Sequence, residues 1–286
     1  MPLDKYNAIW ISHSSISDFL QCRRAYFLKN IYRDPKTNHK IKIMSPPLAL
    51  GAAVHNVIDE ISMLPVAQRI TMSLMDRFDS AWKNFEGKRG GFLNKDTESR
   101  FKEKGREMIH RVAKNPGPIV KKAVKIKGDL PHYWFSEEDN IILCGKIDWL
   151  EYLEDDDSVN IIDFKTSKYD ESPESLQLPI YYLLVKNCQT RPVTGASYWY
   201  LQRNDEPTSV KLPDEYGSYE KILDIAREIK AARQLEKFEC AQGGCQYCKP
   251  YEAILKGESE FVYVDSFNSD IHIIPQTSNE DSSEIL

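Results

Sequence analysis

The stretch that decides the fold is Ile161-Ile162-Asp163-Phe164-Lys165-Thr166. Two branched apolar residues lead into it, which is typical of a buried strand. Because side chains alternate between the faces of a strand, Asp163 and Lys165 point to one face and Phe164 to the other. A carboxylate and an ammonium group at the end of an apolar strand are costly unless they face water or have a function. Taken alone, the stretch fits an ion pair on an edge strand, so its interpretation depends on its neighbours.

A second predicted strand ends near another carboxylate. Residues 140–150 are mostly apolar, and Asp148 lies close to their end. The acidic run at 154–157 is a polar turn that leads into the strand predicted at 158–166, so the two strands form a hairpin. This hairpin brings Asp148 close to Asp163. Two carboxylates at one point repel each other unless a cation lies between them.

Two helices supply further polar side chains. The apolar spacing predicts a helix over about 47–61, which carries His55 one turn after Gly51. A second helix is predicted over 173–187, and Gln177 and Tyr181 lie four residues apart on one of its faces. A lone histidine is more often a core or surface residue than a ligand, so His55 gains significance only from the complete series.

Taken together, this series resembles the PD-(D/E)XK nuclease superfamily, specifically its RecB-like branch. The matching pieces lie in the order of the family and are Gly51 with His55, Gly145-Lys146-Ile147-Asp148, Asp163-Phe164-Lys165 and Gln177-Leu178-Pro179-Ile180-Tyr181. Each motif is weak alone, but four in order are fairly specific. The resemblance implies an α/β fold with a restriction-endonuclease-like core, in which helices flank a mixed central sheet. It also implies an N-terminal helical region.

The same resemblance implies a metal-dependent phosphodiesterase. The metal ligands that it implies for Mg²⁺ or Mn²⁺ are His55, Asp148, Asp163 and the backbone carbonyl of Phe164. Asp148, Asp163 and Lys165 are the implied catalytic residues, and Gln177 and Tyr181 would border the DNA or position Lys165. Oxygen ligands suit these hard cations, and the cation neutralises the clustered carboxylates.

The six cysteines suggest a second site. A helix predicted over 14–33 carries Cys22, and Cys240, Cys245 and Cys248 lie within nine positions near the other end. These segments are similar to those of the iron–sulfur exonucleases of the CRISPR-associated and AddB types. In that family the third C-terminal cysteine follows the C-x-x-C pair, whereas this chain has Ile254 there. A four-iron iron–sulfur cluster, zinc and free buried cysteines all stay open, and Cys144 and Cys188 are assigned to the core.

The bulk composition fits an ordinary globular protein. The 286 residues are 41% hydrophobic and 28% charged, with a net charge of -5, so total charge does not indicate a nucleic-acid binder. Residues 100–127 contain ten Lys or Arg against two acids, which fits either a solvated helix face or a phosphate-contacting surface. We find no membrane-spanning run and no signal peptide, and we expect a cytoplasmic, reducing setting, in the host cell if the protein is viral.

These observations lead to one prediction of organisation and function. We expect a single nuclease domain over 1–265 with a helical insert at about 65–128 and a cysteine region at 240–251, followed by a disordered acidic tail at 266–286. We expect an exonuclease that acts on single-stranded or end-containing DNA in recombination, repair, replication or CRISPR adaptation. A structure-selective endonuclease and a non-catalytic DNA-binding or scaffolding subunit are the alternatives. Any helicase or integrase-type partner would be a separate chain, because no Walker A loop is present.

Overall fold

The computed structural model describes residues 4–69, 73–128 and 130–275. Its central sheet has four strands in the order β5-β6-β7-β8. These strands are β5 (Trp149–Leu153), β6 (Ser158–Lys165), β7 (Val193–Tyr200) and β8 (Thr208–Val210). β6 and β7 are parallel, and the other two pairings are antiparallel. The prediction of a mixed central sheet is therefore confirmed.

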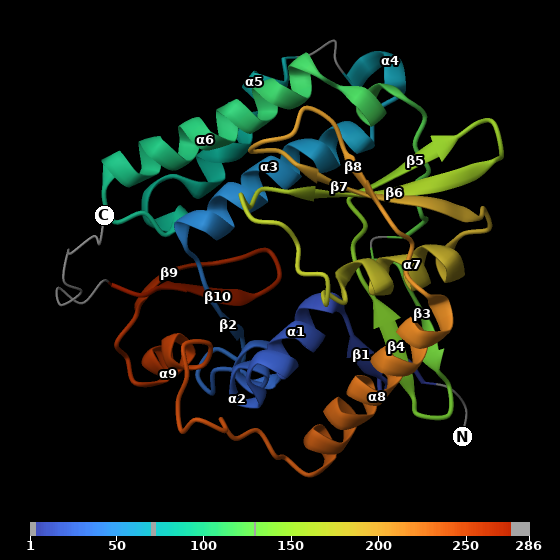
Figure 1. Ribbon diagram of the computed structural model, residues 1–286. Helices are drawn as coiled ribbons and strands as arrows, with labels where there is room; N and C mark the ends of the chain where they lie inside the picture. The colour runs from blue at the N-terminus through green and yellow to red at the C-terminus, as the bar shows by residue number, and fades with distance from the viewer. Residues whose placement is uncertain (1–3, 70–72, 129, 276–286) are drawn as a thin grey trace.

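Helices cover both faces of this sheet, as Figure 1 shows. On one face lie α3 (Pro46–Ser62), α4 (Val66–Arg69), α5 (Leu74–Trp82) and α6 (Lys95–Lys114). Their apolar side chains pack against Ile162, Phe164 and Trp199. On the other face lies α7 (Gln177–Cys188), which packs against Ile161 and Tyr198. The alternation along β6 thus sends neighbouring residues into two different cores, as the period of a strand requires.

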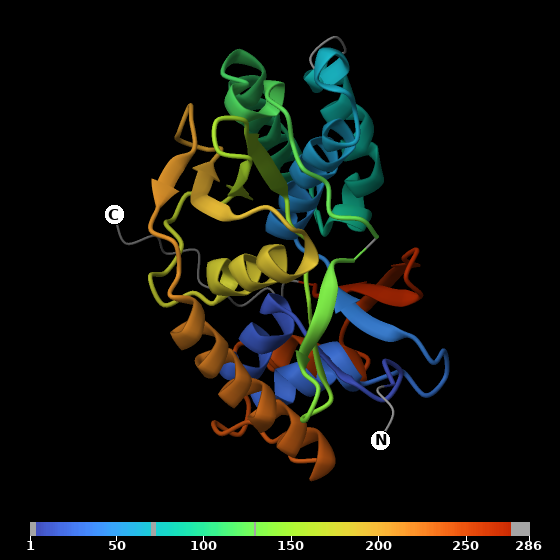
Figure 2. The same ribbon diagram turned by 90° about the vertical axis from the view of Figure 1, so that its right-hand side faces the viewer.

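A second sheet extends below α7 in Figure 2 and has the order β1-β4-β3. Its strands are β1 (Ile9–Ile11), β4 (Ile141–Cys144) and β3 (His132–Ser136). The long helix α8 (Glu215–Gln234) shares an apolar core with this sheet and α7. The predicted continuous strand over 140–150 is wrong, because it is divided between β4 and β5. The two strands belong to different sheets, and the break at 145–148 is where Asp148 lies.

A third sheet has the order β2-β10-β9. Its strands are β2 (Lys40–Ile43), β9 (Glu260–Val264) and β10 (Ser269–Ile273). β10 runs parallel to β2, which leads directly into α3. The predicted tail is therefore wrong where it covers 269–273, because these residues form a strand with a buried Ile271 and Ile273. Residues 276–286 of that prediction lie outside the described residues.

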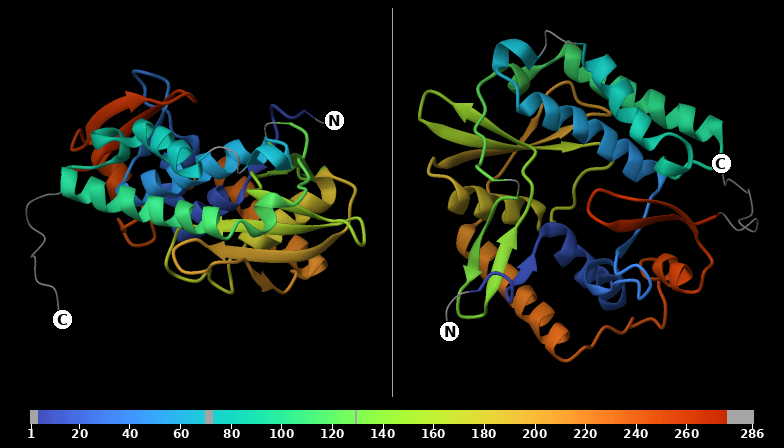
Figure 3. Two further views of the ribbon diagram at one scale, coloured as in Figure 1. Left: turned by 90° about the horizontal axis from the view of Figure 1, so that it is seen from above. Right: turned by 180° about the vertical axis from the view of Figure 1, so that it is seen from behind.

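The N-terminal helix is divided into short pieces. They are α1 (His13–Gln21), α2 (Arg23–Tyr26) and the π-helical turn η1 (Phe27–Ile31). Cys22 is extended, with φ of -167° and ψ of 118°, so it ends α1 and caps α2. The expectation that Cys22 lies inside one helix is wrong. Figure 3 shows these pieces and α9 (Lys249–Leu255) at the end of the molecule opposite α6.

These elements give an α/β fold of the restriction-endonuclease type, with a mixed central sheet between helices. Helices α4, α5 and α6 lie within the predicted helical insert of 65–128, and Phe78 and Trp82 are fully buried. The predicted helix of 173–187 begins later, at Gln177. Among the described residues, no helix is long and apolar enough to cross a membrane.

Candidate active site

The C-terminal end of β6 carries the two charged side chains that the sequence singled out. Asp163 is only 3% exposed, and the Lys165 side chain lies beside it, with 3.0 Å between Nζ and Oδ2 of Asp163. Phe164 points the other way and packs between Trp149 and Trp199. The predicted alternation along the strand is confirmed. A buried carboxylate beside a half-buried ammonium group argues against a simple solvated ion pair.

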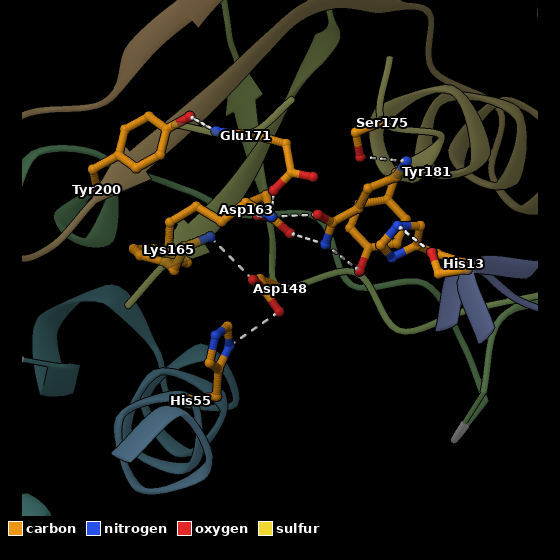
Figure 4. Close-up of polar contacts among 12 residues, drawn as sticks. His13, His55, Asp148, Asp163, Lys165, Glu171, Ser175, Tyr181 and Tyr200 are labelled. Carbon is orange, nitrogen blue, oxygen red and sulfur yellow. Dashed lines mark hydrogen bonds and ion pairs between the residues drawn. The ribbon is translucent and has the colours of Figure 1, made fainter. Parts of the chain in front are cut away.

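Asp148 joins this pair from the segment that precedes β5. Its Oδ2 accepts a hydrogen bond from the backbone N–H of Phe164 at 3.0 Å. Its Oδ1 faces His55 on α3, with 3.3 Å between Oδ1 and Nδ1, and Figure 4 shows the imidazole pointing toward the carboxylate. The antiparallel pairing of β5 and β6 ends at Trp149 and Ile162. The residues just past this end of the pairing, Asp148 and Asp163, therefore come together as the predicted hairpin requires.

The backbone of Phe164 also faces this cluster. The carbonyl of Lys165 accepts a hydrogen bond from the N–H of Leu201, just beyond the end of β7. Successive carbonyls of a strand point to opposite sides. The carbonyl of Phe164 therefore points away from β7, to the side where β5 has ended and Asp148 lies.

Gln177 and Tyr181 on α7 complete the group. The amide nitrogen of Gln177 donates to Asp163 Oδ1 at 2.9 Å and to the Tyr181 hydroxyl at 3.2 Å. The amide oxygen of Gln177 accepts a hydrogen bond from Lys165. Gln177 thus holds both charged side chains of β6 at once, and the four-residue spacing places Tyr181 directly behind it.

The sequence reasoning missed Glu171, which lies in the loop between β6 and α7. Its Oε2 is 2.8 Å from Lys165 Nζ, and its backbone N–H donates to the Tyr200 hydroxyl at 2.9 Å. Lys165 therefore lies among two carboxylates and an amide oxygen (Figure 4). No spacing rule marks a single acid in a polar loop, so only the three-dimensional structure finds it.

The electrostatics of the cluster favour cation binding. Burial and then the nearby charge of Asp148 raise the pKa of Asp163 to about 7, despite the opposing effect of Lys165. Burial alone would lower the pKa of His55, but Asp148, Asp163 and Asp59 together raise it. The raised pKa of His55 reflects the negative charge around it, and the raised pKa of Asp163 reflects burial first and the charge of Asp148 second. A bound divalent cation would remove that charge excess.

The donor set fits a hard divalent cation. It consists of carboxylate oxygens from Asp148 and Asp163, the nearby carbonyl of Phe164 and one imidazole nitrogen from His55. Within the described part of the chain, the buried Oδ2 of Asp163 has no hydrogen bond of acceptable geometry, although it lies beside Lys165. Oxygen-rich sites with few protein ligands are typical of Mg²⁺ and Mn²⁺.

A family profile described as the PD-(D/E)XK nuclease superfamily matches residues 10–254. The chain belongs to this superfamily. The match covers most of the 286 residues and includes every side chain of the cluster. No curated protein matches the chain. Membership of the superfamily supports a nuclease function for the cluster that β6, α3 and α7 build.

In this nuclease Lys165 is held in its charged form. Burial would lower its pKa, but the Asp163 charge and the Glu171 carboxylate outweigh burial and raise it. A permanently charged lysine is a poor proton acceptor and a good partner for an anion. Lys165 is therefore better suited to stabilise negative charge than to deprotonate a water.

The basic stretch at 100–127 is less positive in the folded nuclease than in the sequence. Five of its cations form ion pairs with acids from other segments. The five are Lys102 and Arg106 with Asp79, Arg111 with Asp205, Lys121 with Glu151 and Lys122 with Glu154. For these residues the interpretation as a solvated, neutralised surface is favoured over the phosphate-contacting one.

The four cysteines of the second predicted site also come together. The sulfur atoms of Cys22, Cys240, Cys245 and Cys248 lie within 4.8 Å of one another. Cys144 and Cys188 lie outside this group, and Cys144 is buried with its Sγ 3.3 Å from the carbonyl of Ile11. Such a group can bind a metal ion or a metal cluster. Cys240, which lies before the C-x-x-C pair, thus joins the other three cysteines in one group.

Proposed function

We propose that this protein is a Mg²⁺- or Mn²⁺-dependent DNA nuclease, and specifically an exonuclease that acts on single-stranded or end-containing DNA. The observation that carries this proposal is the convergence of Asp148, Asp163, Lys165 and His55 at the end of β6. A subunit that only bound DNA would have no need for two carboxylates at a point where one of them has its pKa raised to about 7. This argues against the scaffolding alternative.

The chain's residues have distinct roles in the proposed reaction. His55, Asp148, Asp163 and the carbonyl of Phe164 would hold the cation, which lowers the pKa of a bound water and so supplies the nucleophile. Lys165 stabilises the negative charge that develops on the phosphoryl oxygens. Gln177 hydrogen-bonds to both Lys165 and Asp163 and so fixes their relative positions. Tyr181 accepts a hydrogen bond from Gln177 and so helps to orient its amide.

The biological setting is part of the same proposal. Recombination, repair, replication and CRISPR adaptation all generate single strands or ends for such an exonuclease. Unwinding of duplex DNA would come from a helicase, or ends from an integrase-type protein, on a separate chain. These partners follow from the proposed substrate and are supported by the absence of a Walker A sequence in this chain.

The test is a cleavage assay on end-labelled linear and on circular single-stranded DNA, with Mg²⁺ or Mn²⁺ against EDTA. We expect linear DNA to be degraded, circular DNA to survive, and EDTA to stop the reaction. Cleavage of the circle would show an endonuclease. Retained DNA binding without any cleavage would move the assignment to a scaffolding subunit.

Two lysine variants make the assay specific to the site. Lys165→Ala should abolish cleavage while the protein stays folded, because no other cation occupies that position between Asp163 and Glu171 among the described residues. Lys36→Ala, on an exposed turn before β2, is the matched control and should cleave at the rate of the unmodified protein. Cation-dependent cleavage by purified Lys165→Ala would remove the assignment.

A further inference from the structure

The distances between the four sulfurs of the cysteine site can be compared with those expected for a single metal ion and for a metal cluster. All six sulfur–sulfur separations are within 4.8 Å, and Sγ of Cys245 is 3.8 Å from Sγ of Cys248. Four thiolates around one zinc ion, with Zn–S bonds of about 2.3 Å, form a tetrahedron with an edge of about 3.8 Å. The Cys245–Cys248 distance equals this edge, and the other separations stay within 4.8 Å, so the group is compact enough for ligands that share a single ion.

An iron–sulfur cluster of four irons does not fit this arrangement. In such a cluster each cysteine binds a different iron, so the whole metal–sulfide core separates the four thiolate sulfurs. They then lie considerably farther apart than four ligands on one ion. Cys22, Cys245 and Cys248 are buried at 7%, 8% and 1% exposure, and Cys240 is half-buried, so the four sulfurs converge without such a core between them.

The backbone around the cysteines supports a compact site. The N–H of Ala25 points to Sγ of Cys22 at 3.4 Å, and the N–H of Cys245 points to Sγ of Cys248 at 3.2 Å. Hydrogen bonds of this kind stabilise thiolates and fix the direction of metal ligands. They orient two of the four sulfurs toward a common centre.

The turn after Cys240 explains how this chain completes the set. The N–H of Gly243 donates to the carbonyl of Cys240 at 3.0 Å, and Gly243 and Gly244 have φ of +65° and +136°. Positive φ is readily adopted only by glycine, so this pair of glycines turns the chain between Cys240 and Cys245. This turn lets Cys240, which lies before the C-x-x-C pair, reach the same centre as the other three cysteines.

We propose that Cys22, Cys240, Cys245 and Cys248 bind one structural zinc ion in place of the four-iron cluster that the family resemblance implies. The ion has four protein ligands and no open position, so its role is structural. It fastens the start of α2 to the segment before α9, which are more than two hundred residues apart in the chain. Metal binding between such distant segments stabilises the fold directly.

The experiment measures the metal content of the full-length protein, independently of nuclease activity. The protein is produced in cells supplied with both iron and zinc, with their iron–sulfur assembly machinery overproduced, and is purified without oxygen. We expect one zinc per chain, negligible iron and sulfide, and a colourless protein. About four irons and four sulfides per chain with brown visible absorption, or no metal at all, would overturn the proposal.

Three variants locate the ion and separate this proposal from the proposed function. Cys240→Ser should lose most of the zinc, whereas Cys188→Ser, a cysteine outside the group, should keep it. If Cys240→Ser does not fold, titration of the unmodified protein with a zinc-binding dye that competes for the metal gives the same stoichiometry. Lys165→Ala should retain full zinc without cleaving DNA, so loss of one property does not imply loss of the other.

Discussion

Replacing Asp163 by asparagine should remove a large part of the pH dependence of stability of the protein in EDTA. The pKa of this carboxyl is raised to about 7 in the folded protein, whereas an unfolded chain would have it near 4. The folded state therefore holds a proton that the unfolded state has lost. Stability from this group is present at low pH and is lost as pH rises toward the folded pKa.

The magnitude follows from the two pKa values. Between pH 5 and pH 8 the unmodified protein should lose roughly 2–3 kcal/mol of unfolding free energy through Asp163 alone. This corresponds to a decrease in Tm of about 5–10 °C for a chain of this size. Asp163→Asn stays neutral throughout, so its stability relative to the unmodified protein should increase by roughly 2–3 kcal/mol between pH 5 and pH 8.

Thermal unfolding in EDTA at pH 5, 6, 7 and 8 measures this effect. Asp155→Asn, an exposed carboxylate on the β5–β6 turn, is the control and should follow the unmodified protein at every pH. Adding Mg²⁺ at pH 8 should raise the Tm of the unmodified protein and leave Asp163→Asn unchanged. Parallel pH profiles for Asp163→Asn and the unmodified protein would refute the argument.

Three further substitutions test particular contacts. Glu171→Gln should lower kcat by about tenfold with little change in KM, since one charged partner of Lys165 is lost. The pH at which activity is lost on the alkaline side should also decrease, because Glu171 helps to raise the pKa of Lys165. Unchanged activity at all pH values would exclude a role for this contact. Gln177→Ala should reduce cleavage more than DNA binding, measured by kcat against Kd, and equal losses would argue for substrate contact instead. Arg69→Met should destabilise the fold by about 3 kcal/mol or more, because the guanidinium donates to the carbonyls of residues 64, 119 and 121. Unfolding in urea measures this loss. Arg100→Met, on the exposed face of α6, is the control and should change the free energy of unfolding by less than about 0.5 kcal/mol.

The alternation of β6 was predictable, because a strand period of two assigns Asp163 and Phe164 to opposite faces without further information. The grouping of His55, Asp148 and Gln177 followed from the family resemblance, and the structure brings these residues together. Their roles in cleavage stay predictions. Cys240 joins the other cysteines by geometry, although it lies before the C-x-x-C pair in the sequence.

The rest depended on contacts between distant segments. β10 has a short, polar sequence and becomes a strand only because β2 and β9 lie on either side of it. The division of 140–150 between two sheets coincides with Gly145, Lys146 and Asp148, which interrupt the apolar run, but the assignment of the two parts to different sheets depends on distant partners. Glu171 is fixed by Lys165 and the Tyr200 hydroxyl, and neither contact can be read from its neighbours.

The pairing of β2 with β10 has a consequence for synthesis on the ribosome. β2 leads into the helix that carries His55, yet among the described residues its only strand partner is β10, at 269–273. Cys22 likewise lies near the start of the chain, whereas the three cysteines that it contacts, Cys240, Cys245 and Cys248, lie near the other end. The β2–β10 pairing and the cysteine group therefore form only after residues 240–273 have been translated.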